Sequence, residues 1–383
     1  MRYESDRLPD LSVSVGKKER RAADRSFLTL ILILLTLGVI MVLSSSYARA
    51  YYDPGNITGG SAVYFFVRQL LYALAGVGAM LAASRIPMEL YRKNSFYIML
   101  IAVVLLALVP FIGVRSNGAR RWIGVGGLTV QPSEIAKLAV ILEFSAMICK
   151  IRTGMSSVRY GIIPFTAILI LLVGLLVLEP HFSASVIIIA TGGIMMFLGG
   201  VRLGWFIGAF ALAGSALAVV LTMFPYASTR IVTWRDPFSS SSDEGYQIVQ
   251  SLYSIGSGGL SGLGLGASRQ KYLYLPEEHN DFIFSVVCEE LGFIGAALIL
   301  VLFSLLIIRG YWIAMKCPDR YSMLVCAGIT SLLAIQVFLN IAVVTNLIPC
   351  TGISLPFFSY GGTALIIELF EMGIVLSASR TLI

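Results

Sequence analysis

The sequence predicts an all-α integral membrane protein with about ten transmembrane helices and a large extracytoplasmic loop between the seventh and eighth of them. Of the 383 residues, 57% are hydrophobic and only 13% are charged, whereas soluble domains carry roughly 25% charged residues. The hydrophobic residues also form long blocks, such as Phe27 to Leu43 and Ile162 to Leu178. Each block approaches or exceeds the length that crosses roughly 30 Å of hydrocarbon, so an ordinary soluble globule is excluded.

A hydropathy window of about 19 residues locates the ten candidate spans. Polar residues interrupt the fourth and the tenth. The first span follows a polar leader, residues 1–26, without a small-residue cleavage site, so we expect a retained helix and no signal peptide. Residues 27–383 are expected to form a single membrane domain. The spans centre near Leu35, Ala75, Val104, Ile141, Leu169, Ala190, Leu212, Leu300, Ile335 and Ile367.

The positions of Lys and Arg predict that both termini lie in the cytoplasm, because basic residues in short loops stay on that side. With the N-terminus inside, the inner segments hold 18 basic residues and the outer loops hold eight. Residues 225–281 then form the large outer loop. The net charge of +7 is spread over many loops, which argues against nucleic acid as a partner. Five scattered cysteines without a CxxC motif likewise predict no zinc or disulfide framework.

A glycine-rich run, residues 255–266, lies inside the large loop. Each glycine in a helix costs about 1 kcal/mol relative to alanine, so we expect a loop that approaches another segment closely. A dinucleotide-binding fingerprint would need a preceding soluble strand and a following helix, and neither is predicted here.

Three polar clusters lie at the ends of the spans, where ionisable groups need a partner or a function. The first joins Arg120 and Arg121 to a segment that begins at Pro132, in which Glu134 and Lys137 fall on one helix face. These two side chains can simply pair with each other. The functional alternative is that Arg121 and Lys137 meet an anionic group while Glu134 holds one of them in place.

The second cluster crowds Glu277, His279 and Asp281 where the large loop enters the eighth span. Glu289 or Glu290 follows about two turns deeper on a similar face. An Asp at a helix start is often only an N-cap. Carboxylates crowded in a loop built for close approach are, however, partly desolvated, and desolvation raises their basicity. We therefore interpret Asp281 as a base that can take a proton from a sugar hydroxyl.

The third cluster, residues 347–363, contains no charged residue and is interrupted by prolines and glycines. It cannot form one straight helix, so we expect a broken segment packed in protein, with a tight turn between two spans as the alternative. Outside the clusters, His181 beside Glu179 is a weaker catalytic candidate, because a single histidine at a helix entrance is more often an interfacial side chain.

Together the three clusters resemble the SEDS family (shape, elongation, division and sporulation), whose members include RodA, FtsW and SpoVE. Several separated motifs in the family's order are far more specific than one motif alone. Ten spans with cytoplasmic termini also agree with this family. The matching stretches are Gly118 to Trp122, Gln131 to Lys137, Arg230, Asp236 with Pro237, Gly245 to Gln247, Leu275 to Phe284, Glu289 to Gly292, Asn340, Pro349, Thr351 with Gly352, Pro356 and Ser359 to Gly362.

The resemblance implies a peptidoglycan glycosyltransferase of the bacterial plasma membrane that polymerises lipid II in complex with a class B penicillin-binding protein. Asp281 aligns with the family's essential aspartate and is expected to deprotonate the 4-hydroxyl of the acceptor sugar. Inversion is expected, because no second carboxylate is placed as a nucleophile. A divalent cation, Mg²⁺ or Mn²⁺, is expected without a recognisable protein motif to hold it, and its ligands are unknown. The expected substrate-binding residues are Arg121, Glu134, Lys137, Arg230, His279, Glu290, Ser359 and Tyr360.

The chain departs from the family pattern at three places. Glu179-Pro180-His181 replaces the usual Gln-Pro-Asp, so no role for that loop is transferred. Cys350 stands where valine or asparagine is common, and Glu368 and Glu371 lie in a last span that is usually more apolar. The segment Lys271 to Pro276 favours the division and sporulation branch over the elongation branch.

Two other functions fit the same clusters. A lipid II flippase would use intramembrane charges such as Glu134, Lys137 and Glu290 as a translocation path. A non-catalytic scaffold for the class B penicillin-binding protein would have no activity of its own. Polymer formation by the purified protein distinguishes the enzyme from both.

Overall fold

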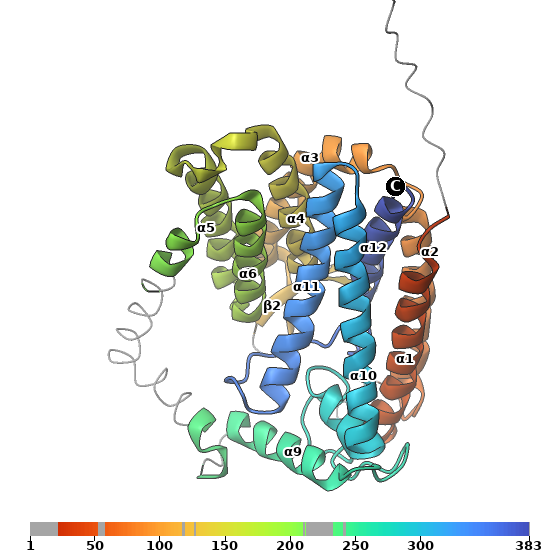
Figure 1. Ribbon diagram of the computed structural model, residues 1–383. Helices are drawn as coiled ribbons and strands as arrows, with labels where there is room; N and C mark the ends of the chain where they lie inside the picture. Colours follow the sequence, from red (N-terminus) through yellow and green to blue (C-terminus); the bar gives the residue numbers. More distant parts are fainter. Residues whose placement is uncertain are drawn as a thin grey trace, which may run out of the picture.

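A computed structural model describes residues 22–52, 58–116, 119–125, 128–209, 211, 233–239 and 243–382. In this part of the chain, seven helical segments are long and apolar enough to cross a membrane, and they pack side by side in one bundle (Figure 1). Helices suit these apolar blocks because they satisfy their own backbone hydrogen bonds inside hydrocarbon. The predicted all-α membrane fold is confirmed. The helices are α1 (Arg25–Tyr52), α2 (Tyr64–Ala83), α3 (Met88–Ile112), α5 (Ile163–Leu178) with the π-helical turn η2 (Val158–Ile162), α6 (Phe182–Gly199), α10 (Ile283–Lys316) and α11 (Arg320–Val344).

Two further helices of the bundle lie where the fourth and tenth spans were predicted. They are α4 (Pro132–Ile151) and α12 (Thr363–Ser379), and both carry charged residues that lower their hydropathy. The predicted seventh span, centred near Leu212, lies mostly outside the described residues. The total of ten spans therefore stays a prediction.

The longest loops gather at one end of the bundle, which we call the loop end. It holds the segment 114–130, the helix α9 (Asp243–Gly258) and the loops 259–282 and 345–362; α9 marks this end at the bottom of Figure 1. The two ends of the described chain meet at the opposite end, where the backbone N–H of Asp24 donates to Ser379 Oγ at 3.0 Å. Both ends of the described chain therefore lie on one side of the bundle, and the cytoplasmic location of the termini stays a prediction.

A small antiparallel sheet at the loop end, between α3 and α4, is not expected from the sequence. Its strands are β1 (Val114–Ser116), β2 (Ala119–Val125) and β3 (Leu128–Val130), in the order β1-β2-β3. Two of the strands have only three residues, too few for an alternating pattern to stand out in the sequence. The central strand, β2, carries Arg121 at an irregularity of its pairing with β1, between Arg120, which pairs with Arg115, and Trp122, which pairs with Val114.

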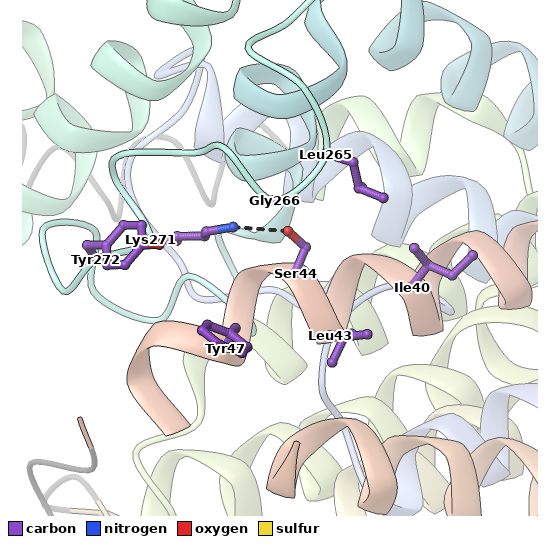
Figure 2. A pocket seen from close by; sticks show the side chains of 8 residues that line it. All are labelled: Ile40, Leu43, Ser44, Tyr47, Leu265, Gly266, Lys271 and Tyr272. Atoms are coloured by element: carbon purple, nitrogen blue, oxygen red, sulfur yellow. Dashed lines mark hydrogen bonds between the residues drawn. The ribbon is translucent and has the colours of Figure 1, made fainter. Parts of the chain in front are cut away.

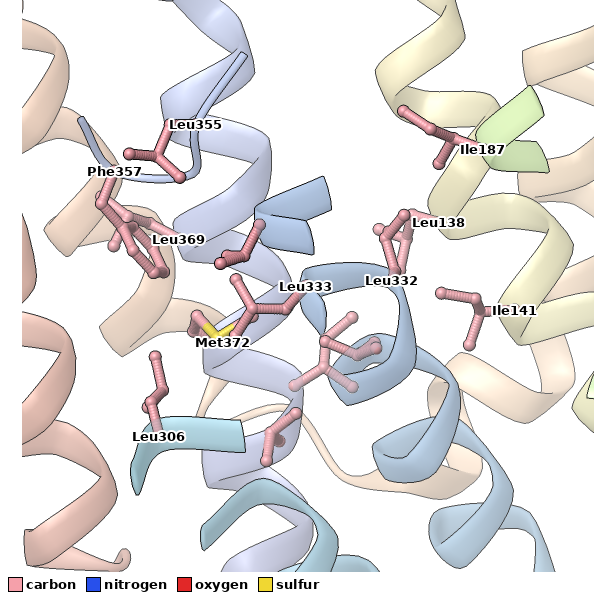
Figure 3. Packing of buried hydrophobic residues seen from close by; sticks show 14 of the residues in the cluster. Leu138, Ile141, Ile187, Leu306, Leu332, Leu333, Leu355, Phe357, Leu369 and Met372 are labelled. Carbon is pink, nitrogen blue, oxygen red and sulfur yellow. The ribbon is translucent and has the colours of Figure 1, made fainter. Parts of the chain in front are cut away.

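The buried core is centred on α11. In the most apolar stretch of α11, 72% of the residues are buried inside the protein, compared with 28% in that of α10. Helix α11 is therefore surrounded by other helices, while α10 exposes more of its surface. In Figure 3, Leu332 of α11 lies opposite Leu138 and Ile141 of α4, and Leu333 lies on the side of Met372 of α12. This apolar contact fixes α11 and α12, whose ends carry the loop 345–362.

The glycine-rich run packs backbone against backbone on α10. A Cβ atom on Gly258 would lie 2.0 Å from the carbonyl oxygen of Cys288, and one on Gly262 would lie 2.2 Å from that of Glu290. The expected close approach is therefore confirmed. The expectation of a loop is wrong for residues 255–258, which form the last turn of α9, because tertiary packing compensates for the poor helix propensity of glycine.

Candidate functional site

Asp281 lies at the loop end, two residues before α10 begins, and its side chain is half-buried. The loop 345–362 lies directly against it, since a Cβ atom on Gly352 would be 3.1 Å from Asp281 Oδ2. Gly352 also has a φ of +61°, a conformation that glycine adopts without steric cost. The second and third sequence clusters therefore meet at Asp281, and the third is an irregular packed segment, as predicted.

Arg121 brings the first sequence cluster to the same place. Its Nη2 donates a hydrogen bond to the carbonyl oxygen of Pro180 at 2.7 Å. Burial lowers the pKa of Arg121, while the nearby carboxylates of Asp281 and Glu179 act in the opposite direction. An arginine remains charged under such a shift. The site therefore holds one fixed positive charge between two acidic side chains.

The surroundings of Asp281 make it more basic than a surface aspartate. Burial raises its pKa to about 6, and Glu277 adds to the rise, while Arg121 and His279 oppose it. At neutral pH the carboxylate is thus ionised yet close to the pKa that suits a general base. The N-cap interpretation is not supported, because the N-cap of α10 is Phe282, which makes no side-chain capping hydrogen bond.

Three of the expected binding residues join the two loops around Asp281. The backbone N–H of Tyr360 donates to the carbonyl oxygen of His279 at 2.9 Å, and Ser359 Oγ donates to that of Asn280 at 2.8 Å. The His279 ring also lies 4.6 Å from the Phe65 ring and 5.8 Å from the Tyr360 ring, between centroids. These contacts fix the backbone on the N-terminal side of Asp281.

Glu134 and Lys137 form the ion pair that their spacing predicts. The distance from Lys137 Nζ to Glu134 Oε2 is 2.6 Å, and both residues are buried in α4. Lys137 acts electrostatically on His181, and both members of the pair act on Glu368 and Glu371 of α12. The pair therefore belongs to a deeper polar group that borders the Asp281 site through His181.

Glu290 has different neighbours from Asp281. Its Oε1 lies 2.8 Å from Lys271 Nζ, and Ser44 Oγ donates to both of its oxygens at 2.7 and 2.6 Å. Figure 2 shows Lys271 reaching Ser44 beside a pocket of about 340 Å³ between α1 and the loop 259–282. These contacts of Glu290 thus anchor the large loop to α1, and a role in substrate binding stays a prediction. The pocket is also lined by Ile40, Leu43, Tyr47, Leu265, Gly266 and Tyr272.

Glu179 and His181, only a weaker candidate pair from the sequence, are both buried at the site. They are 1% and 8% exposed, so His181 is not the interfacial side chain that its position predicted. Burial raises the pKa of Glu179 to about 8, although the positive charge of Arg121 acts to lower it. Burial, Arg121 and Lys137 lower the pKa of His181 to about 3, so its ring is neutral. The signal in the sequence was two ionisable residues around a proline between two apolar blocks.

Two expectations find no counterpart in the described residues. Arg230 lies outside them, so its role in substrate binding stays a prediction. Among the described residues, no three His, Cys, Asp or Glu side chains are grouped so that they could hold a metal ion. The divalent cation is expected without a protein motif to hold it, and it stays a prediction.

Comparisons with known proteins cover nearly the whole chain. The family of FtsW, RodA and SpoVE, described as cell cycle proteins, matches residues 24–382. Stage V sporulation protein E of Bacillus subtilis is 40% identical over 364 residues, which cover 94% of this chain and 98% of that protein. The probable peptidoglycan glycosyltransferase FtsW of Trichlorobacter lovleyi is 38% identical over 374 residues, 97% of each chain. These names fit the predicted division and sporulation branch.

Solved structures have the same fold. One is a chain from a study of the structural coordination of polymerization and crosslinking by a peptidoglycan synthase complex. It has a TM-score of 0.78 at 27% identity and covers 94% of this chain and 98% of that chain. The crystal structure of RodA from Thermus thermophilus has a TM-score of 0.68 at 26% identity, with 94% and 97% coverage. The resemblance seen in the sequence is thus confirmed along the whole chain, and the protein belongs to the FtsW, RodA and SpoVE family of cell cycle proteins.

Proposed function

We propose that the protein is a peptidoglycan glycosyltransferase that polymerises lipid II into glycan strands. Relatives that carry the name peptidoglycan glycosyltransferase are 35% to 38% identical over nearly the full length of both chains. The observation that carries the proposal is the environment of Asp281, a half-buried carboxylate with a pKa of about 6 that lies near the Arg121 guanidinium. A base and a fixed cation side by side are the groups that glycosyl transfer from a diphosphate requires.

In the proposed reaction, Asp281 accepts the proton of the acceptor sugar's 4-hydroxyl. The oxygen then forms a bond to the anomeric carbon of the donor, while the bond from that carbon to the diphosphate oxygen breaks. The lipid diphosphate leaves with the electron pair. A single displacement of this kind inverts the anomeric centre, and it needs one base and no protein nucleophile.

Arg121 supplies the charge that the leaving group needs. Negative charge grows on the diphosphate as the bond to carbon breaks, and a preorganised guanidinium stabilises it more than water does in a partly desolvated site. The hydrogen bond to the carbonyl oxygen of Pro180 holds the guanidinium in position before substrate binds. The pair Glu134 and Lys137 is proposed to contribute at longer range, since Lys137 acts on the neighbouring His181.

In the proposed reaction, a divalent cation would bind together with the diphosphate of the substrate. Since the described residues offer no grouped set of three metal ligands, a cation would be held mainly by the diphosphate oxygens, and would add positive charge there. No step above depends on it. Polymerisation with and without a chelator measures its contribution.

The proposed orientation places the loop end outside the cell and both termini in the cytoplasm. The excess of basic residues on the predicted inner segments supports this orientation. The similarity to a chain of a peptidoglycan synthase complex supports assembly with a second protein, and we take a class B penicillin-binding protein as that partner. Its part in division, elongation or sporulation depends on which such partner it binds.

Purified protein incubated with lipid II tests the proposed function. We expect glycan strands that a gel resolves by length and that a muramidase digests. A flippase would instead move labelled lipid II across vesicles without forming polymer, and a scaffold would yield polymer only when a second polymerase is added. Either of these results would contradict the assignment. The contradiction requires that no polymer forms, either from the protein alone or from the protein together with a class B penicillin-binding protein.

A further inference from the structure

Glu179 is a buried acid whose oxygens have no hydrogen-bond partner. It follows the last residue of α5 at the loop end and is 1% exposed. Among the described residues, neither Oε1 nor Oε2 accepts or donates a hydrogen bond. A buried carboxyl group without a hydrogen-bond partner is costly to ionise, so its neutral form is favoured. The geometry thus describes a carboxyl group that holds its proton.

The guanidinium of Arg121 acts electrostatically on Glu179 and opposes the rise of its pKa. In the part of the chain that the structure describes, the two side chains form no ion pair within 4.0 Å. Arg121 is instead held by the carbonyl oxygen of Pro180, the next residue after Glu179, and its Nε has no partner. Arg121 also responds to Asp281. Two carboxylates therefore compete for one guanidinium.

Among the charged and titratable groups around Glu179 and Arg121, Glu179 is the group whose charge changes near pH 8. The strand β2 contributes Arg121, and the loop 259–282 contributes Asp281, which acts on Arg121. Helix α4 contributes Lys137, which acts on His181. The lowered pKa of His181 keeps it neutral, and the pKa of Asp281, about 6, leaves it ionised at neutral pH. The pKa of Glu179, about 8, lies where neither of them changes charge.

We propose that Glu179 controls when Arg121 is available to an anionic diphosphate group. With a neutral Glu179, the guanidinium is free to bind the diphosphate, whereas an ionised Glu179 captures the guanidinium and weakens diphosphate binding. Glu179 is thus a positioning residue that acts through Arg121. The link to lipid II rests on the proposed function, while the effect on diphosphate binding does not.

The sign of the pH dependence follows from the raised pKa. Below about pH 8 Glu179 is protonated, so the site carries the full charge of Arg121. As the pH rises through that value, the carboxylate gains its charge and competes with the ligand. Glutamine has nearly the same shape and stays neutral at every pH. The variant Glu179→Gln therefore removes the switch without removing the side chain's bulk.

The direct test measures the affinity of the purified protein for inorganic diphosphate by calorimetry at about pH 7 and about pH 9. We expect wild type to lose at least about tenfold in affinity at the higher pH, because a charge-assisted contact to Arg121 is lost. Glu179→Gln is expected not to show this loss, and it corrects for the further ionisation of the diphosphate itself between the two values. The matched control is Glu89→Gln, the same change at an exposed position in the first turn of α3, which should behave as wild type.

Polymerisation of lipid II gives the second readout. The KM of wild type should rise between the same two pH values, and that of Glu179→Gln should stay constant. Superimposed pH profiles for wild type and Glu179→Gln, or diphosphate affinity that does not fall with pH in wild type, would overturn the inference. A wild type that binds diphosphate with the expected pH dependence but makes no polymer would refute the proposed function and leave the switch intact.

Discussion

The side-chain amide of Asn340 donates a hydrogen bond to the backbone carbonyl of Asp281, with 2.8 Å between Nδ2 and O. The same Nδ2 donates to the carbonyl oxygen of Ile353 at 2.7 Å. One fully buried amide on α11 thus holds both loops that form the site. Of the seven candidate membrane spans, α11 is buried to the largest extent, so the position of Asp281 is tied to a helix enclosed by the bundle.

Replacing Asn340 by alanine is expected to lower activity and stability together. The change leaves two buried carbonyl oxygens without a donor, and each such loss costs about 1 to 3 kcal/mol. We expect a lower unfolding temperature and a fall in kcat larger than that in KM, because the base is displaced. Gln336→Ala is the control, since Gln336 is buried one turn earlier on α11 and bonds to neither Asp281 nor Ile353. Equal kcat losses in the two variants would count against a positioning role.

The acid side of the pH profile should report the ionisation of Asp281. Its pKa is raised to about 6, and only the ionised form can accept a proton, so activity falls as the pH falls through that value. The measurement is kcat/KM for lipid II from about pH 5 to about pH 8, since this ratio reports the groups of the free enzyme. A profile that stays flat to about pH 5 would disagree with the environment described for Asp281.

Breaking the buried ion pair of Lys271 and Glu290 should destabilise the protein. Lys271→Met leaves Glu290 with a buried charge that its neutral donors, Ser44 Oγ and the backbone N–H of Ser268, do not balance, and losses of this kind reach about 3 to 5 kcal/mol. Thermal unfolding in detergent measures the effect. The double variant Lys271→Met with Glu290→Gln is expected to be more stable than Lys271→Met alone. If the second change instead added a further loss of similar size, the pair would not be coupled.

Two glycines on α9 should respond in opposite directions to the same substitution. A Cβ atom on Gly258 would lie 2.0 Å from the Cys288 carbonyl oxygen, whereas nothing lies within 4 Å of one on Gly256. Gly258→Ala is therefore expected to separate α9 from α10 and lower the unfolding temperature. Gly256→Ala is expected to raise it, because alanine favours the helix by about 1 kcal/mol. Similar effects of the two changes would show that the close approach is absent.

Most of the bundle could be predicted because membrane insertion depends on local composition. The apolar blocks around Leu35, Val104 and Leu300 became helices where they were expected, since no other structure satisfies the backbone in hydrocarbon. The short sheet of residues 114–130 could not be predicted, because its pairing depends on contacts between strands of three to seven residues.

For the site, the sequence indicated which residues were chemically unusual but not which of them meet. Asp281, Arg121 and His279 come together as expected, while Glu290 turns to Lys271 and Ser44. Helical periodicity places Glu290 near the face of Asp281, but a partner 19 residues earlier in the loop decides where its charge is used. The sequence pointed to no role for Glu179, because its properties come from burial, which no single residue type reveals.

The central claim is that the carboxylate of Asp281 activates the acceptor sugar, and the initial rate of lipid II polymerisation by Asp281→Asn tests it most directly. Asparagine keeps the size of the side chain but cannot accept the proton, so the rate should fall at least about 100-fold while the unfolding temperature stays that of wild type. A folded Asp281→Asn protein that polymerises lipid II at the wild-type rate would contradict the claim.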